Sequence, residues 1–388
     1  MTSPSRARTP VEPGERVIAL DAVRGLALFG VLFVNLLTIF RVSLFQQFLP
    51  TDGAVKPATD QLVARILVVG FEWKAFTLFS LLFGVGLAAQ HERTRARGVA
   101  FAGYVARRLG FLLVLGLVHL FLVWNGDVLT LYAVAGAIAA PLLRLPVRAL
   151  LVLGVALLVV NALPLPFPTP FASFEALQSH VAEARRVYGF GTFGEALAFR
   201  VREVRPISAL LLWTAPRTLG LFLLGACAWR SGLLRGEHPR LLRAISILGI
   251  AVGGGVVWAE SSGAIDFHTW RDAVSRWGAV LLALGYGATV FVAFERAVLA
   301  RILAVLAPVG RMALTSYLTQ SIVLSALFYG WGLGLFGRLG ETSAAAIAIA
   351  IFVVQVALST LWLRWFRFGP VEWLWRSVTY GAMPTLRR

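Results

Sequence analysis

The stretch RRLGFLLVLGLVHLFLVWNGDVLTLYAVAGAIAAPLLR, residues 107–144, decides the fold. It holds two long apolar runs, which are joined by Trp124-Asn125-Gly126-Asp127 and flanked by arginines. About twenty apolar residues in a helix span the hydrocarbon core of a bilayer. The link is too short for anything but a tight turn, so the stretch predicts an antiparallel hairpin of two transmembrane helices.

The same alternation of apolar runs and short basic links continues along the chain. Of its 388 residues, 58% are hydrophobic and 14% are charged, whereas a soluble domain is about half apolar and a quarter charged. We therefore expect an all-α polytopic integral membrane protein with about ten transmembrane helices. These are expected near residues 17–40, 62–90, 106–124, 127–143, 147–163, 207–229, 241–259, 275–294, 310–334 and 343–366.

The distribution of basic residues predicts the orientation. The net charge is +17, and the arginines fall in short clusters between apolar runs. Lys and Arg favour the cytoplasmic ends of membrane helices, and most of them become cytoplasmic if both termini are. We therefore expect both termini in the cytoplasm and, since no organelle-sorting signal is evident, a multi-pass protein of the bacterial plasma (inner) membrane. Such clusters are topology signals, so no nucleic-acid partner is expected.

Three parts are expected along the chain: an N-terminal membrane half at 1–163, an outer loop at 164–206, and a C-terminal membrane half at 207–388. The loop opens with alternating prolines at 164–170, which prevent a helix there. It continues with apolar and charged residues interleaved at helical spacing. This pattern favours interfacial helices on the outer membrane surface, and a plain connecting loop is the alternative.

The first predicted helix carries a polar stripe of Asp21, Arg24 and Asn35, which lie within about 60° of one another on a helical projection. Ionisable groups are costly in the hydrocarbon region, so each is a candidate functional residue. Asp21 and Arg24, three residues apart, can form an ion pair on one helix face. The alternative is a purely structural pair that ties this helix to its neighbours.

The second polar cluster surrounds the turn of the hairpin. His119 lies in the apolar run LVLGLVHLFLVW, and an imidazole can act as a base near neutral pH. Asp127 begins the next helix, where it can cap that helix or turn back across Asn125-Gly126 to orient the imidazole. The alternative is that His119 is only a hydrogen-bonded packing residue.

Three more polar side chains lie within predicted helices: Lys74, Arg217 and Gln320. Lys74 and its neighbour Glu72 interrupt the over-long segment 62–90, which we expect to break or re-enter. Gln320 can bond a neighbouring helix, which is the commoner role of such residues, or a ligand, and Arg217 has no assignable partner. Gly84 and Gly86 are expected to permit close helix packing. No HExxH, CxxC, Walker or GxSxG pattern occurs, so no metal site is expected.

Five segments, in this order, resemble the YeiB-like family of bacterial inner-membrane proteins: RVIALDAVRGLALFGVLFVN (16–35), FTLFSLLFGVG (76–86), RRLGFLLVLGLVHLFLVWNGDVLTLYA (107–133), GRMALTSYLTQS (310–321) and FGPVEWLWR (368–376). The resemblance covers nearly the whole chain. It implies a C-terminal domain of unknown function at about 230–388.

The N-terminal half also resembles transmembrane acyltransferases of the heparan-α-glucosaminide N-acetyltransferase type, through Leu20-Asp21, Arg24-Gly25 and Val34-Asn35. That resemblance implies transfer of an acyl group from a cytoplasmic thioester, acetyl-CoA or another acyl-CoA, to an acceptor reached from the outer side. It also implies a histidine as catalytic base, for which His119 is the candidate.

The chemistry of acyl transfer suggests the other roles. It needs a base for the acceptor and donors for the developing oxyanion. Asp127 would orient the base, and either Asn35 or the Trp124 indole would supply a donor. The candidates for binding substrate or the coenzyme A phosphates, which suit arginine, are Asp21, Arg24, Lys74, Arg107, Arg108, Trp124, Arg217 and Gln320.

Two other functions stay open at this point. The polar stripe could be the path of a transporter or exporter of a lipid-like or small polar substrate, or the protein could bind lipid without catalysis. The expected partners are membrane lipids and a small-molecule, glycan or lipid acceptor. The small-residue helix faces are compatible with a homodimer.

Overall fold

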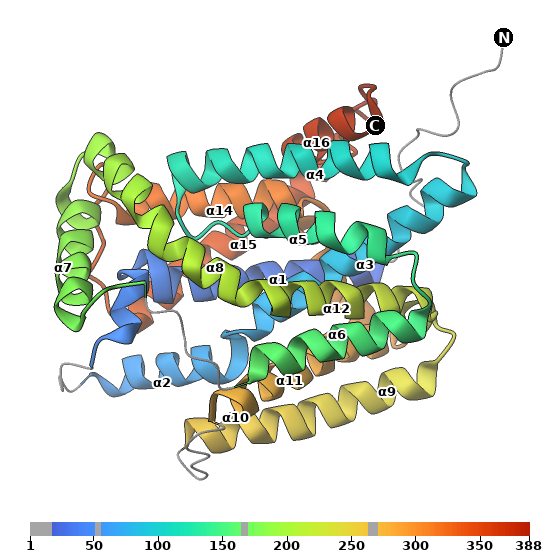
Figure 1. Ribbon diagram of the computed structural model, residues 1–388, viewed down its shortest axis with the longest axis horizontal. Helices are drawn as coiled ribbons and strands as arrows, with labels where there is room; N and C mark the ends of the chain where they lie inside the picture. The colour runs from blue at the N-terminus through green and yellow to red at the C-terminus, as the bar shows by residue number, and fades with distance from the viewer. Residues whose placement is uncertain (1–17, 51–55, 164–169, 263–270) are drawn as a thin grey trace.

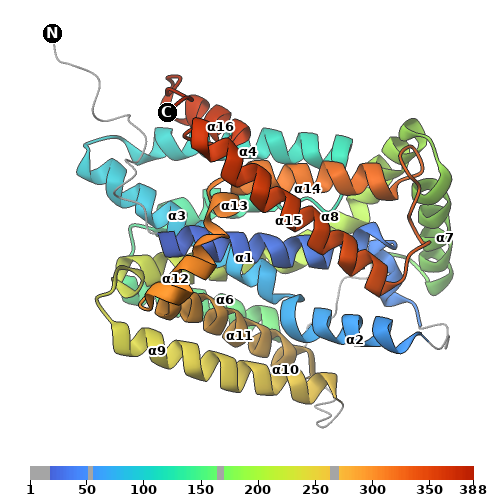
Figure 2. The same ribbon diagram turned by 180° about the vertical axis from the view of Figure 1, so that it is seen from behind.

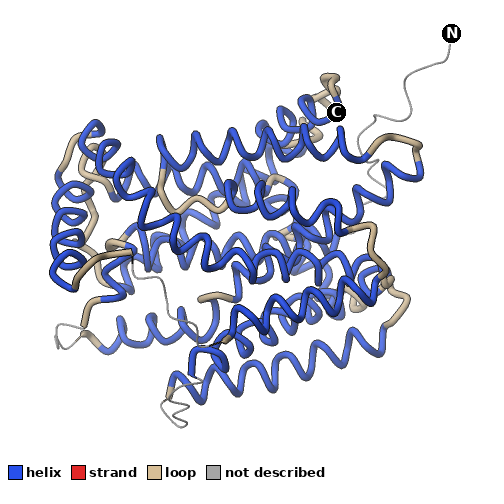
Figure 3. Tube along the Cα trace, viewed as in Figure 1, coloured by secondary structure: helices blue, strands red, loops and turns tan. Residues whose placement is uncertain are grey.

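The computed structural model describes residues 18–50, 56–163, 170–262 and 271–388. Over these ranges the regular secondary structure is helical (Figure 3). The one exception is an isolated β-bridge between Phe366 and Arg387. The predicted all-α class is therefore confirmed. The α-helices are α1 Ile18–Asn35, α2 Ala58–Ile66, α3 Lys74–Ala96, α4 Phe101–Val118, α5 Leu129–Leu142, α6 Val147–Ala162, α7 Phe174–Phe190, α8 Phe193–Arg230, α9 Pro239–Leu248, α10 Gly254–Ser261, α11 Arg271–Ala293, α12 Ala297–Ala304, α13 Ala307–Arg311, α14 Ala313–Phe328, α15 Glu341–Trp365 and α16 Pro370–Tyr380.

Seven helical segments in the described residues are long and apolar enough to cross a membrane: Ile18–Phe40, Ala58–Ala96, Phe101–Val123, Phe193–Arg230, Pro239–Ser261, Ala273–Ala293 and Glu341–Trp365. Three shorter apolar helices, α5, α6 and α14, coincide with the remaining predicted segments. The chain is thus a polytopic membrane protein.

Four π-helical turns extend or join these helices, namely η3 Leu36–Phe40, η5 Leu67–Phe71, η6 His119–Val123 and η8 Gly249–Gly253. Two short 3₁₀ helices, η4 Leu44–Phe48 and η7 Leu233–Arg235, lie between longer elements. A π-turn inserts an extra residue into a helix and often occurs at a functional site. The turn η6 begins at His119.

The long apolar segment around Glu72 is broken, as its charges predicted. The turn η5 ends at Phe71, and α3 begins at Lys74. Between them, Trp73 has φ 62°, in the left-handed region, which is unfavourable for an aromatic residue. Because of this break, a new helix begins in the middle of a segment that is long enough to span the membrane.

The helices run roughly parallel, with α7 standing across one end of the bundle (Figure 1). We call this the distal end. The opposite, basal end holds the start of α1 together with α16 and the C-terminus (Figure 2). Long-range contacts join α1 to α3 and α13, and α8 to α3 and α6. The core of the bundle therefore forms around α1, α3 and α8.

The expected outer loop is largely helical. Its proline run at 164–168 lies outside the described residues, but α7 and the first part of α8 fill the remainder. The predicted helix start at 207 is wrong, because α8 begins at Phe193 and continues past Pro206 and Pro216. A capping box of Thr192 and Glu195 starts it. Prolines are tolerated within membrane helices because neighbouring groups satisfy the backbone that they free.

Of the two glycines expected at a helix contact, one is at such a contact and the other is not. A Cβ on Gly84 would lie 2.0 Å from the carbonyl oxygen of Phe222 on α8, and one on Gly225 would lie 2.0 Å from that of Leu81 on α3. Gly86 has no atom within 4 Å of its Cβ position, so the prediction for Gly86 is wrong. Of the two predicted glycines, Gly84 alone lies at the close approach of α3 and α8, which it shares with Gly225 of α8.

Gly84→Ala is expected to lower the stability of the protein by about 1–3 kcal/mol or more, because the new methyl group must push two helix backbones apart. Gly86→Ala is the matched control and should lie within about 0.5 kcal/mol of wild type. Thermal unfolding in detergent measures both. Equal melting temperatures for the two variants would contradict the close contact.

Candidate functional site

A cavity of about 260 Å³ lies toward the basal end, among α1, α3, α4, α14 and α16. Five arginines line it: Arg24, Arg93, Arg108, Arg311 and Arg376. Its lining carboxylates are Asp21 and Glu372. The arginines outnumber the carboxylates, so the cavity suits an anionic ligand.

The predicted ion pair of the first helix is confirmed and lies in this cavity. Arg24 Nη1 donates to Asp21 Oδ1 at 2.6 Å. The side chain of Asp21 is 6% exposed, and that of Arg24 is 30% exposed. Arg24 therefore keeps part of its guanidinium free toward the cavity. The buried negative charge of Asp21, in turn, is balanced by Arg24.

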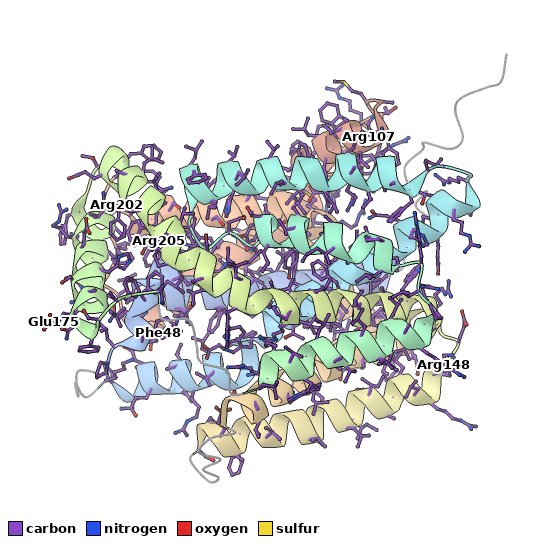
Figure 4. The ribbon with its side chains drawn as sticks, in the orientation of Figure 1. Phe48, Arg107, Arg148, Glu175, Arg202 and Arg205 are labelled. Carbon is purple, nitrogen blue, oxygen red and sulfur yellow. The ribbon has the colours of Figure 1, made fainter. Side chains whose placement is uncertain are left out.

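The two adjacent arginines of α4 have different surroundings. Arg108 lines the cavity, and its guanidinium carbon lies 3.5 Å from the centre of the Trp375 ring. Arg107 lies beside α16 (Figure 4), where its Nε donates to the carbonyl of Thr379 at 3.0 Å. Successive helix positions point about 100° apart. Arg107 therefore does not share the cavity with Arg24 and Arg108.

The helix α16 attaches to the start of α14 through Glu372. This carboxylate accepts hydrogen bonds from the backbone N–H groups of Leu314 at 2.6 Å and Thr315 at 3.0 Å, and from the Thr315 hydroxyl at 2.5 Å. Burial raises the pKa of Glu372, and these hydrogen bonds act in the opposite direction. Neither a long apolar run nor local spacing marks this helix and its carboxylate in the sequence, so neither was predicted.

A wall of three aromatic residues, Phe79, Tyr132 and Tyr317, separates the large cavity from a second one of about 70 Å³. The Tyr132 hydroxyl shares a 2.7 Å hydrogen bond with Ser80. Asn35 lines the small cavity, together with the first residues of α3. The polar stripe of α1 thus spans both cavities, with its ion pair in the large one and its amide in the small one.

His119 and Asp127 form a buried pair, as predicted. The Nδ1 atom of His119 lies 3.0 Å from Asp127 Oδ1, and the two side chains are 1% and 0% exposed. Asp127 Oδ2 also accepts from the backbone N–H of Thr130 at 2.8 Å, so one carboxylate both caps α5 and orients the imidazole. The π-turn and the tight turn together bring residues eight apart into contact.

The other ring nitrogen of His119 has no partner. Among the described residues, the buried His119 Nε2 and Trp124 indole nitrogen have no hydrogen-bond partner, and the buried Tyr317 hydroxyl donates to no acceptor. The His119 ring lies 5.2 Å from that of Tyr317 and 6.2 Å from that of Trp124, measured between centroids. Buried polar atoms almost always have partners. A hydrogen-bonded packing role therefore does not account for the free nitrogen of His119.

A network at the distal end holds the segment that carries this pair. Arg200 Nη1 donates to the carbonyl of Phe121 within η6 at 3.3 Å. One turn further along α8, Glu203 is 1% exposed and accepts from Asn125. It also contacts the Tyr188 hydroxyl at 2.6 Å and His180 Nε2 at 2.9 Å.

Arg200 and Glu203 were both missed by the sequence analysis. They lie in a stretch where charged residues alternate with apolar ones, and this pattern does not distinguish a buried pair from an exposed one. Burial, and after it the charge of Glu203, raise the pKa of Tyr188 well above its ordinary value. The first part of α8 thus belongs to the polar interior of the protein.

Among the described residues that line the two cavities, His119, Asp127 and Trp124 are absent, and so are the remaining predicted residues. Lys74 Nζ donates to the carbonyl of Val68 at 2.7 Å, and Arg217 Nη2 donates to Thr77 Oγ1 at 2.7 Å. Gln320 Nε2 donates to Gln355 of α15 at 2.7 Å. The prediction that Gln320 bonds a neighbouring helix is confirmed.

The fold and these sites define a multi-pass α-helical membrane protein that combines a buried His–Asp pair with an arginine-lined cavity. Residues 228–382 match the family described as "Protein of unknown function (DUF418)", as the expected domain at about 230–388 predicted. The chain is 33% identical over 391 residues to "Uncharacterized protein YxaH" of Bacillus subtilis (strain 168), an alignment that covers 96% of each protein.

A second relative is "Uncharacterized protein YeiB" of Escherichia coli (strain K12), which is 31% identical over 389 residues, or 95% of this chain and 97% of that protein. The chain therefore belongs to the YeiB/YxaH family of multi-pass membrane proteins, as the five segments predicted, and its relatives are bacterial. No solved structure matches the chain.

Proposed function

We propose that this protein is a membrane acyltransferase, which moves an acyl group from acyl-CoA to an acceptor reached from the opposite side of the membrane. The observation that carries the proposal is the buried His119–Asp127 pair. The imidazole ring, whose Nε2 has no partner among the described residues, lies 5.2 Å from the Tyr317 ring between centroids, and Tyr317 belongs to the wall of the arginine-lined cavity.

In this reaction, His119 Nε2 takes the proton of the acceptor hydroxyl or amine as the acceptor attacks the thioester carbonyl. Asp127 holds the imidazole in position through Nδ1 and stabilises the imidazolium. The carbon–sulfur bond then breaks, and the coenzyme A thiolate leaves and takes up the proton. The Tyr317 hydroxyl and the Trp124 indole N–H, neither of which donates a hydrogen bond to a described residue, are the candidate donors for the developing oxyanion.

The donor enters from the basal end. The phosphates of coenzyme A suit the arginines of the large cavity, since guanidinium groups donate to phosphate oxygens. The pantetheine arm then has to pass between Tyr132 and Tyr317 to reach His119. Side-chain movement of this wall is therefore part of the proposed mechanism.

This arrangement gives the protein an orientation in the membrane. If the basal end faces the cytoplasm, both termini are cytoplasmic, and the three shorter apolar helices complete about ten crossings. The relatives from bacteria support a place in the bacterial plasma membrane. Acyl-CoA is a cytoplasmic compound, which agrees with this orientation.

A transporter is the second candidate. The two cavities lie in line along α1, and the single wall between them includes two tyrosines. Such a pair of chambers is compatible with alternating access to a polar substrate. The transporter needs neither coenzyme A binding nor a base, so one binding experiment separates the two candidates.

Purified protein in detergent is expected to bind coenzyme A and acetyl-CoA saturably, measured by calorimetry at fixed salt concentration. Arg24→Ala and Arg93→Gln should each weaken binding about tenfold, because each removes a charge-assisted contact to phosphate. Arg95→Gln is the matched control, since Arg95 is exposed on the same helix as Arg93 and does not line the cavity. Folded wild-type protein that binds neither compound would exclude the thioester donor and favour transport.

A further inference from the structure

The start of α3 lies against a buried arginine that lacks a counter-ion. Arg217 of α8 is 2% exposed, and it donates one hydrogen bond, from Nη2 to Thr77 in the first turn of α3. Its guanidinium carbon lies 4.9 Å from the centre of the Trp73 ring. Its Nε and Nη1 atoms are buried and have no hydrogen-bond partner in the part of the chain that the structure describes. A buried guanidinium with unused donors is costly unless an anion or another acceptor satisfies it.

The charged neighbours of this arginine do not compensate it. The charges that act on nearby Lys74 include the carboxylates of Glu72 and Glu260. The charged neighbours that act on Arg217 include Arg276 and Lys74, both of them cations. Lys74 is thus balanced by carboxylates, whereas among the described residues Arg217 forms no ion pair. The uncompensated positive charge at the start of α3 is therefore that of Arg217.

The backbone at the start of α3 adds to the positive electrostatic potential around Arg217. At the break, the N-cap residue Trp73 makes no side-chain cap, and the Lys74 N–H donates to the Glu72 carbonyl at 2.8 Å, so the N–H groups of Ala75 and Phe76 are the ones turned to the helix start. The N-terminus of a helix carries unsatisfied donors and a partial positive charge, which favour a bound anion. Membrane transporters use the ends of broken helices in the same way. The free donors of Arg217 and the start of α3 therefore favour the same kind of ligand.

This helix start also borders the small cavity. Trp73, Ala75 and Phe76 line that cavity, together with Asn35 and Tyr317. Trp73 is 40% exposed, so the break is not sealed within the core of the bundle. A group bound here is one aromatic side chain, Tyr317, away from His119.

We infer that the start of α3 is a phosphate-binding site, in which Arg217 and the first backbone N–H groups of α3 hold a phosphate group. If the protein is an acyltransferase, this is the anchor of its acceptor, and the acceptor is a phosphate-bearing compound. That second step rests on the proposed function, but the binding site itself does not. The phosphate could belong to a lipid headgroup or to a soluble phosphate ester.

The test measures binding to delipidated full-length protein in detergent by native mass spectrometry. The probes are phosphatidylglycerol, glycerol 1-phosphate and, as a lipid without phosphate, diacylglycerol. Wild-type protein should retain one phosphatidylglycerol or one glycerol 1-phosphate at concentrations where diacylglycerol does not bind, and the probe that binds identifies the source. Arg217→Gln should weaken this binding at least tenfold.

Arg205→Gln is the matched control, because Arg205 is an exposed arginine on the same helix (Figure 4). It should bind as wild type does. Arg217→Lys tests the site if Arg217→Gln does not fold, and it should weaken binding less, since it keeps the positive charge but loses the guanidinium donors Nε and Nη1. Binding of all three probes alike by wild type, or equal binding by the Arg217 and Arg205 variants, would overturn the inference. Coenzyme A binding is measured separately, so its loss would count against the proposed function alone.

Discussion

Replacement of His119 by alanine is expected to lower acyl transfer by about 10²–10⁴-fold, because it removes the only buried base with a free nitrogen beside the cavity wall among the described residues. Membranes that contain the protein are incubated with radiolabelled acetyl-CoA, and the label that enters the lipid and glycan fractions is counted. Asp127→Asn should fall between wild type and His119→Ala, since the imidazole keeps a hydrogen-bonding neighbour but loses the charge that stabilises its protonated form.

The control for this experiment is His238→Ala, since His238 is exposed at the start of α9. It should transfer label as wild type does. His119→Ala should also keep its coenzyme A binding and its melting temperature, which shows that only the chemical step is lost. Full label transfer by a folded His119→Ala protein would remove His119 from the mechanism.

The largest effect on stability is expected at Glu203. Glu203→Leu should lower the free energy of unfolding by at least about 3 kcal/mol, because it leaves the buried polar groups of Asn125, Tyr188 and His180 without their common acceptor. Thermal unfolding in detergent measures this loss. We also expect less acyl transfer than the stability alone explains, because Asn125 belongs to the turn that returns Asp127 to His119.

The control for Glu203→Leu is the same substitution of a second carboxylate, which lies on the adjacent helix. Glu183 of α7 pairs with Arg202 at 2.5 Å, but both side chains are exposed. Exposed ion pairs contribute about 0–1 kcal/mol, so Glu183→Leu should hardly change the melting temperature. If Glu203→Leu unfolds no earlier than Glu183→Leu, the buried network does not stabilise the distal end.

The membrane helices were predictable because apolar length is a property of each segment alone. The break near Glu72 was predictable as well, since a helix that carries two charges is unstable as an uninterrupted span. The start of α8 was not predictable. Charged residues at 195–205 suggested an interfacial position, whereas Arg200 and Glu203 face inward beneath α7.

Parts of the candidate site were also predictable, where the partners lie close in sequence. Asp21 and Arg24 are three residues apart on one helix face, and Asp127 follows His119 across a turn that leaves little choice of direction. Spacing in the sequence could not show which of Arg107 and Arg108 lines the cavity, or which of Gly84 and Gly86 lies at a helix contact. Each choice depends on which neighbouring helix a given face meets.

The sequence by itself therefore determined the membrane class, the helix segments, the family and the local pairs, since composition and short-range helix geometry are enough for these. The tertiary structure alone decided which distant charges share a cavity. Glu372 meets Thr315, Arg200 meets Phe121, and Arg217 meets Thr77 across long stretches of chain. The physical reason is that such contacts depend on the angles and distances at which whole helices pack, which no local pattern specifies.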